Sequence, residues 1–133
     1  MNEPAIECRH LWKLFGGQVA DALAVLDREP LSREEIQTRF NSVAAVADVS
    51  FQVGEGEIFC IMGLSGSGKS TLIRLFNRLI EPSLGQILVR GQDIAAMNAE
   101  QLRATRARHV GMVFQNVALL PHRTVLENAA FGL

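Results

Sequence analysis

The sequence predicts an α/β fold that is built around a strand, a glycine-rich loop and a helix. Residues 58–62 form a short, continuous apolar run, which is typical of a strand that is buried on both faces. Residues 63–71 follow directly and match the pattern G-x-x-x-x-G-K-[ST] of a phosphate-binding loop. Residues 71–79 then place apolar side chains at helical spacing. Because this loop belongs between a buried strand and a helix, its surroundings support nucleotide binding.

The residue types in the loop suit an anionic ligand. Glycines let the backbone approach closely, so that its free N–H groups turn toward the phosphates. The helix that begins as the loop ends adds a positive N-terminal dipole. Lys69 is expected to reach the β- and γ-phosphates, and the Ser70 hydroxyl is expected to bind Mg²⁺. The residues expected to bind the nucleotide here are Gly63, Leu64, Ser65, Gly66, Ser67, Gly68, Lys69, Ser70 and Thr71.

The length and composition are those of one domain. The chain has 133 residues, and 48% of them are hydrophobic, so a core can form. Thirteen Lys and Arg residues stand against 14 Asp and Glu residues, and this balance argues against a nucleic-acid partner. The sequence shows no signal peptide and no apolar run of about 18 residues, so we expect any membrane contact to come through a partner. Cys8 and Cys60 are interpreted as core residues.

The other elements are predicted from periodicity and capping residues. Residues 18–40 are expected to be helical, with a break at Glu29-Pro30 and a capping box formed by Ser32 and Glu35. Asn98 and Thr124 are expected to cap two later helices. Further strands are expected at residues 5–11, 46–53, 86–90 and 110–114.

Two residues outside the loop are candidates for the nucleotide site, each with an alternative. Phe15 precedes two glycines at the end of the first strand, so it either stacks on a base or packs in the core. Gln115 follows the strand at 110–114, and the carboxyl ends of strands face the ligand crevice in α/β sheets. Its amide either binds Mg²⁺ and orders a water near the γ-phosphate, or simply ends the strand.

Taken together, these residues resemble the ATP-binding subunits of ABC transporters, with Phe15 as the A-loop, residues 63–71 as the Walker A loop and Gln115 as the Q-loop. The runs at 61–71 and 112–115 are similar, more narrowly, to the glycine betaine/L-proline importers of bacteria. The further runs that carry this resemblance are Arg74, residues 77–82 and residues 121–128. The resemblance covers nearly the whole chain.

This resemblance implies a P-loop NTPase fold, with residues 1–133 as the N-terminal part of an ABC-type nucleotide-binding domain and residues 18–45 as a helical insert. It implies an ATPase subunit that energises uptake of glycine betaine or proline, with ATP and Mg²⁺ as cofactors. Phe15 would stack on adenine, Lys69 would bind phosphate, and Ser70 and Gln115 would bind Mg²⁺. Catalytic roles would fall to Lys69 and Gln115.

The resemblance also implies partners and a location. Residues 116–124 would lie near the coupling helix of a membrane permease subunit. A second ATP-binding subunit would complete a homodimer, and a substrate-binding protein would act indirectly. The protein would then sit peripherally on the cytoplasmic face of the inner membrane.

The sequence also departs from the family pattern. It contains the Walker A half and an antiparallel β-subdomain, but no Leu-Ser-Gly-Gly signature and no Walker B strand that ends in Asp-Glu. We therefore expect this chain by itself to bind nucleotide weakly and to hydrolyse it poorly. Alternatives are a non-hydrolysing nucleotide-binding or interaction fragment, an ABC ATPase for another solute such as an amino acid, and a small P-loop kinase or GTPase.

Overall fold

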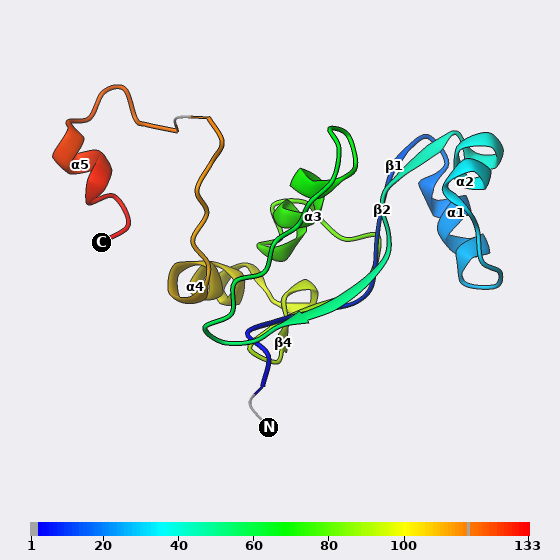
Figure 1. Cartoon of the computed structure of the whole chain (residues 1–133), viewed down its shortest axis with the longest axis horizontal. Helices are drawn as coiled ribbons and strands as arrows, with labels where there is room; N and C mark the ends of the chain where they lie inside the picture. The colour runs from blue at the N-terminus through cyan, green and yellow to red at the C-terminus, as the bar shows by residue number, and fades with distance from the viewer. Residues whose placement is uncertain (1–2, 117) are drawn as a thin grey trace.

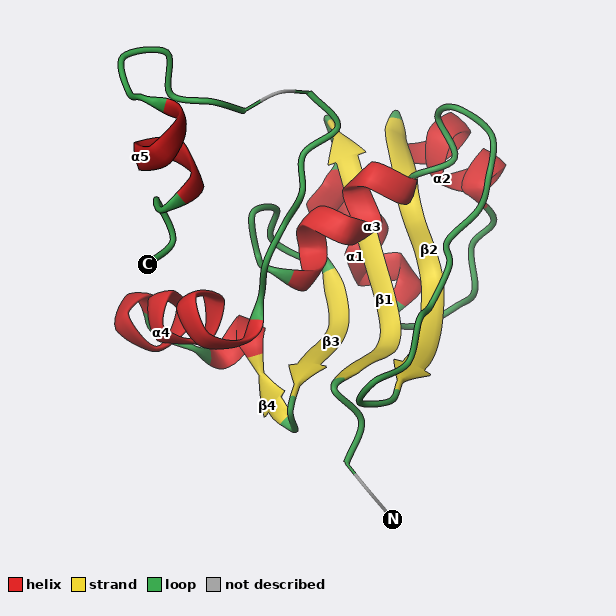
Figure 2. Ribbon diagram, turned by 60° about the vertical axis from the view of Figure 1, so that its left-hand side comes forward, coloured by secondary structure: helices red, strands yellow, loops and turns green. Residues whose placement is uncertain are grey.

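An antiparallel four-stranded sheet is the centre of the computed structural model, which describes residues 3–116 and 118–133. The strand order is β2-β1-β3-β4 (Figure 2). Both long strands exceed their predicted lengths and pair from Ile6↔Val53 to Gly16↔Ser42. The strands are β1 (Ile6–Gly16), β2 (Ser42–Val53), β3 (Leu84–Val89) and β4 (Gln92–Asp93).

The helices begin where capping residues predict them. Ser32, Asn98 and Thr124 each accept a hydrogen bond from the backbone N–H three residues on and complete a capping box, so these three predictions are confirmed. The predicted helical stretch at 18–40 is two helices that are separated by residues 27–32. The helices, traced in Figure 1, are α1 (Val19–Leu26), α2 (Arg33–Phe40), α3 (Lys69–Phe76), the 3₁₀ turn η1 (Ile94–Ala96), α4 (Ala99–His109) and α5 (Val125–Ala129).

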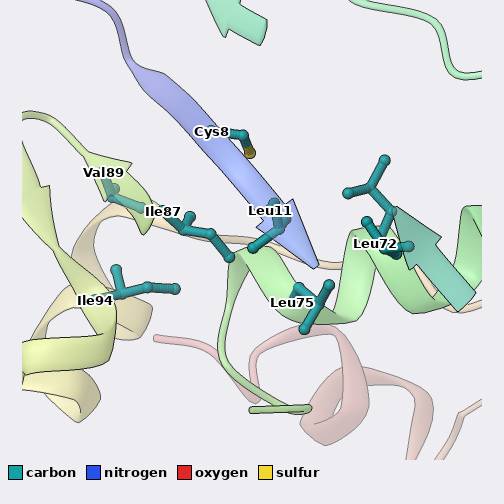
Figure 3. Close-up of a cluster of buried hydrophobic side chains, with 8 residues drawn as sticks. Cys8, Leu11, Leu72, Leu75, Ile87, Val89 and Ile94 are labelled. Carbon is teal, nitrogen blue, oxygen red and sulfur yellow. The ribbon is translucent and has the colours of Figure 1, made fainter. Parts of the chain in front are cut away.

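The larger hydrophobic core joins the sheet to α3, the helix that follows the glycine-rich loop. Leu11 of β1, Leu75 of α3 and Ile87 of β3 are completely buried and belong to this cluster (Figure 3). Cys8 is buried in the same cluster, and burial raises the pKa of its thiol to about 12. The core therefore fixes the position of α3 and of the loop that leads into it.

A second core attaches α1 and α2 to the far end of the two long strands. Ala22 of α1 and Ile36 of α2 are fully buried against Leu14 and Ala44 of the sheet. Phe40, at the end of α2, completes this contact just before β2 begins. The two-helix segment is thus packed on the sheet rather than extended from it.

The prediction of strands at 58–62 and 110–114 is wrong for this structure. Both segments are extended, but neither forms a strand with any described residue. Ile58 and Met62 are each 91% exposed, and Val113 is 98% exposed. Cys60, expected in the core, is exposed as well. A parallel strand needs hydrogen-bonded neighbours, and the described part of the chain supplies none to these apolar runs. Their packing is only partial, since Ile61 contacts the larger core and Phe59 stacks on Phe51.

Arg106 of α4 ties that helix to the end of α3. Its guanidinium donates hydrogen bonds to the carbonyl oxygens of Asn77 and Arg78, at 2.8 and 3.0 Å. These carbonyls follow the last turn of α3, where helix ends leave acceptors without partners. Arg78 in turn donates to the carbonyl oxygens of Ile94 and Met97. The two arginines therefore link α3, η1 and α4 through backbone groups.

Candidate functional site

The glycine-rich loop is held against β2 by a close backbone approach. Gly68 is the N-cap residue of α3 and has φ of +96°, in the region that favours glycine. A Cβ atom at this position would lie 2.1 Å from the carbonyl oxygen of Ala45. Gly68 has no side chain to occupy the N–H groups of the first turn, so these donors are free to face an anion. The positive φ of Gly68 and the uncapped first turn of α3 are features that suit an anionic ligand.

Lys69 folds back over the loop. Its ammonium group donates to the carbonyl oxygens of Gly63 and Leu64, at 2.5 and 2.7 Å, and to Ser67 Oγ at 3.2 Å. All three acceptors are uncharged, and they match the three donors of an ammonium group. An anionic oxygen at this position would make a shorter and stronger, charge-assisted hydrogen bond. A phosphate oxygen at this position would therefore compete with these three acceptors for the N–H donors of the ammonium group.

A cavity of about 540 Å³ opens directly beside the loop. This volume falls within the range of small-molecule sites in proteins, roughly 300–1,000 Å³. One wall is Ser65 to Thr71, including Lys69 and Ser70. A second wall comes from β2, and a third from α2. Its lining residues outside the loop are Arg33, Glu34, Gln37, Val43, Ala44, Ala45 and Gln115.

The structure brings Gln115 to the same cavity as Ser70, although the two are far apart in the sequence. Gln115 lies after the extended segment 110–114, not at the end of a hydrogen-bonded strand. An amide oxygen and a hydroxyl oxygen are both ligands that suit Mg²⁺, which usually takes only one or two protein ligands beside phosphates and water. The residues present therefore fit a magnesium ion that accompanies a nucleotide. No cluster of three His, Cys, Asp or Glu residues suited to a metal occurs in the described ranges.

Phe15 is the strand partner of a residue that lines the cavity. It pairs with Val43, which lines the cavity, and residues directly opposite each other in an antiparallel pair project from the same face. Phe15 is 43% exposed, so its ring is not in the core, and the Lys13 ammonium lies 5.0 Å from the ring centroid. A partly exposed aromatic ring beside the cavity is able to stack on a base.

Other loop residues are arranged as the motif predicts. Gly66 has φ of +79°, and the Ser67 N–H donates to the Leu64 carbonyl at 3.1 Å, which closes a turn. A Cβ atom on Gly63 would lie 2.6 Å from Ser67 Oγ. Leu64 is 85% exposed and contributes its carbonyl to Lys69 rather than a buried side chain.

Sequence reasoning missed the wall formed by α2. Arg33, Glu34 and Gln37 of this helix line the cavity. The sequence does indicate the orientation of the helix, because its buried stripe of Ile36 and Phe40 leaves Arg33 and Gln37 beside that stripe. It does not indicate that the helix packs beside the loop, because that contact depends on the register of β2.

The described helices include none that is long and apolar enough to cross a membrane. The segment after Gln115, which the resemblance associates with a permease, includes residue 117, which lies outside the described residues. Within this segment Leu119 is exposed, and α5 beyond it has no buried residue.

The loop, its helix and the antiparallel sheet define the class of protein as a nucleotide-binding cassette. The ABC transporter family matches residues 46–131. A solved dimeric bacterial ABC transporter cassette superposes with a TM-score of 0.73 at 26% identity, over 96% of this chain and 46% of that one. The chain belongs to the ABC transporter family and corresponds to the N-terminal portion of its ATP-binding domain.

Within the family, the chain is similar to the ATP-binding proteins of several named transport systems. It is 48% identical over 128 residues to the glycine betaine/proline betaine transport system ATP-binding protein of Escherichia coli. It is 47% identical over 133 residues to the trimethylamine N-oxide transport system ATP-binding protein of Ruegeria pomeroyi. These alignments cover 96% and 100% of this chain but 32% and 38% of the two relatives. The chain thus spans about a third of the length of these curated relatives.

Proposed function

We propose that the cavity beside the glycine-rich loop binds Mg²⁺·ATP, as the nucleotide site of an ABC importer subunit. The observation that supports this most directly is the meeting of Ser70, Lys69 and Gln115 at one cavity. Residues 63–71 would bind the phosphate chain through backbone N–H groups, and Phe15 would stack on adenine. Val43, opposite Phe15, lines the cavity, which suits a base at that end.

The chemistry of the site follows from its charges. Lys69 would exchange uncharged loop acceptors for phosphate oxygens and so neutralise part of the ATP charge. Mg²⁺ would be held by Ser70 and Gln115, and when bound it polarises the phosphate oxygens. Gln115 would also orient water near the γ-phosphate. In this proposal Lys69 and Gln115 are the catalytic residues of a complete ATPase.

We further propose that the complete subunit energises uptake of a quaternary or related methylated amine, as the names of its relatives suggest. It would act as a homodimer on the cytoplasmic face of the inner membrane, against permease subunits that contact the segment after Gln115. A substrate-binding protein would take part indirectly. Residues 18–45, in which α1 and α2 pack on the sheet, would be an insert within the domain that occupies 1–133.

The test is ATP binding by the purified chain, measured by calorimetry with Mg²⁺, against the variants Lys69→Ala and Arg103→Ala. Lys69→Ala should remove binding, because its ammonium group lies directly over the loop and is expected to reach the β- and γ-phosphates. Arg103→Ala is a matched control, because it removes an exposed cation on α4 away from the cavity. Unchanged affinity in Lys69→Ala would contradict the proposal.

Base selectivity separates this proposal from a GTPase or kinase. A stacked Phe15 accepts any purine, so ATP and GTP should bind with affinities within about tenfold of each other. A strong preference for GTP would favour a guanine-specific site instead. Phe15→Leu should weaken the binding of ATP and of GTP by a similar factor.

A further inference from the structure

Helix α2 forms a wall of the nucleotide cavity opposite the glycine-rich loop. Arg33, Glu34 and Gln37 line the 540 Å³ cavity together with Ser65 to Thr71. Arg33 also lines a second, smaller cavity of about 140 Å³ with Ser67, Gly68 and Lys69. Arg33 is thus the α2 residue that borders the loop on two sides. Figure 2 shows α2 beside β2, the strand that the loop also contacts through Ala45.

The position of Arg33 is fixed by the packing of its helix. Ile36 is fully buried and Phe40 is 8% exposed, both in the core that joins α2 to the sheet. The N-terminus of the helix is set by the capping box, in which Ser32 N–H donates to Glu35 at 2.7 Å and Glu35 N–H donates to Ser32 Oγ at 3.1 Å. The backbone at Arg33 is therefore already ordered before a ligand binds.

The charges around the cavity favour an anion next to Arg33. The charged residues that line it are Arg33, Lys69 and one carboxylate, Glu34. Lys69 donates to three loop acceptors. Among the described residues, by contrast, no carboxylate lies within 4.0 Å of the Arg33 guanidinium. The nearby Glu35 accepts a hydrogen bond from the Ser32 N–H instead. The Arg33 side chain is exposed at the cavity, so its five N–H donors are accessible to a ligand.

We propose that Arg33 of the two-helix segment binds the phosphate chain of the nucleotide, as a second cation that acts with Lys69. This inference rests on the proposed function and adds a binding residue to the same site. An arginine can meet two phosphate oxygens with parallel N–H groups, which a lysine cannot. The segment between β1 and β2 thereby becomes a part of the site that recognises the number of phosphates.

The experiment measures affinities of the chain for ATP, ADP and AMP by calorimetry in the variants Arg33→Gln and Arg33→Lys. Loss of the charge-assisted hydrogen bonds of Arg33 should weaken ATP binding by at least about tenfold in Arg33→Gln. AMP affinity should change by less than about twofold. AMP has only an α-phosphate, whereas Lys69 and the neighbouring Arg33 are expected to contact the β- and γ-phosphates. Arg33→Lys should recover part of the ATP affinity. The ratio of the ATP affinity of the native protein to that of Arg33→Gln should decrease as the salt concentration rises, because screening weakens charge pairs.

Two controls separate the possible outcomes. Arg39→Gln removes the same charge from the same helix, but Arg39 pairs with Glu29 and lines neither cavity. Equal losses in Arg33→Gln and Arg39→Gln, or no loss in Arg33→Gln, would overturn the inference while leaving the proposed function intact. Lys69→Ala tests the proposed function itself, since ATP binding that survives this change would overturn both. Matching urea midpoints for the native protein and Arg33→Gln are expected and exclude a folding defect as the cause.

Discussion

The antiparallel sheet and the extended segments around the nucleotide loop contain equally apolar residues, but only the sheet buries them. Ile87 in β3 is completely buried, whereas Ile58 before the loop is 91% exposed. The sheet finds its partners within the described residues, since β1 pairs with both β2 and β3. The segments at 58–62 and 110–114 find none there. An apolar run therefore becomes a buried strand only if a partner strand is present.

The helix packed on the sheet and the helix beyond the second extended segment also differ in how much apolar surface they bury. Helix α2 contributes Ile36 and Phe40 to a core, while α5 has no buried residue. Both begin with a complete capping box. Local sequence signals therefore set where a helix begins, and tertiary contacts decide how much it contributes to the free energy of unfolding.

The largest expected difference is between Ile87→Ala and Ile58→Ala. The first leaves a cavity in the core and should lower the free energy of unfolding by about 2–5 kcal/mol. The second removes an exposed side chain and should change it by no more than about 0.5 kcal/mol. Urea unfolding followed by circular dichroism measures both. A loss of several kcal/mol in Ile58→Ala would mean that this segment packs against a partner in solution.

The next largest difference is expected between the variants Gly68→Ala and Gly17→Ala. Gly68→Ala places a Cβ atom against the Ala45 carbonyl at a positive φ, so we expect a loss of about 1–3 kcal/mol and loss of ATP binding. A Cβ atom on Gly17 would meet no atom within 4 Å, so Gly17→Ala serves as the matched control. Calorimetry and urea unfolding report the two consequences separately. Normal ATP affinity in Gly68→Ala would show that the loop tolerates the displacement.

A smaller difference in stability is expected between variants that lack the N-cap side chain of α2 and of α5. Ser32→Ala removes an N-cap from a helix that is packed on the sheet, and we expect a loss of about 1 kcal/mol. Thr124→Ala removes the same type of cap from a helix without buried residues. Its effect on the midpoint of global unfolding should be close to zero, because that helix adds no core contact. Similar shifts in both variants would show that α5 unfolds together with the sheet.

Much of the fold is predictable from the sequence because it depends on local signals. The capping residues Ser32, Asn98 and Thr124 and the glycine-rich loop identify four helix starts. Long-range contacts are less visible. Nothing local shows that Arg106 donates to the carbonyls at the end of α3, because its partners lie 28 and 29 residues away.

In the candidate site, the loop is predictable from local sequence, but the wall formed by α2 is not, because it depends on long-range contacts. Its loop follows from a short motif, since the three side-chain hydrogen bonds of Lys69 are made to residues no more than six positions away. Arg33 of α2 borders the same cavity as that loop because β1 and β2 pair over their whole length and α2 packs against them, which brings Arg33, Ala45 and the loop together. A reader of the sequence sees a helical segment between two strands but not the wall it forms.

The smallest effect is a pH dependence that should differ between the two capping boxes. Hydrogen bonds from the backbone N–H of Ser32 and then from its hydroxyl lower the pKa of Glu35 below its usual value of 4.5, and those from Thr124 do the same for Glu127. A lowered folded-state pKa stabilises the fold above the unfolded-state pKa, and this contribution is lost as the pH falls through the folded-state value. Glutamine also accepts the capping hydrogen bond but does not titrate.

Glu35→Gln should therefore flatten the loss of stability on acidification below about pH 4.5, while Glu127→Gln should leave the global curve unchanged. Urea midpoints between pH 6 and pH 3 measure the slope. Both carboxylates are fully exposed, so the change in slope will be small and requires the paired variants for comparison. If Glu127→Gln flattened the curve as much as Glu35→Gln, α5 would contribute to the cooperative unit, and the contrast between the packed sheet and the segments beyond it would not hold in solution.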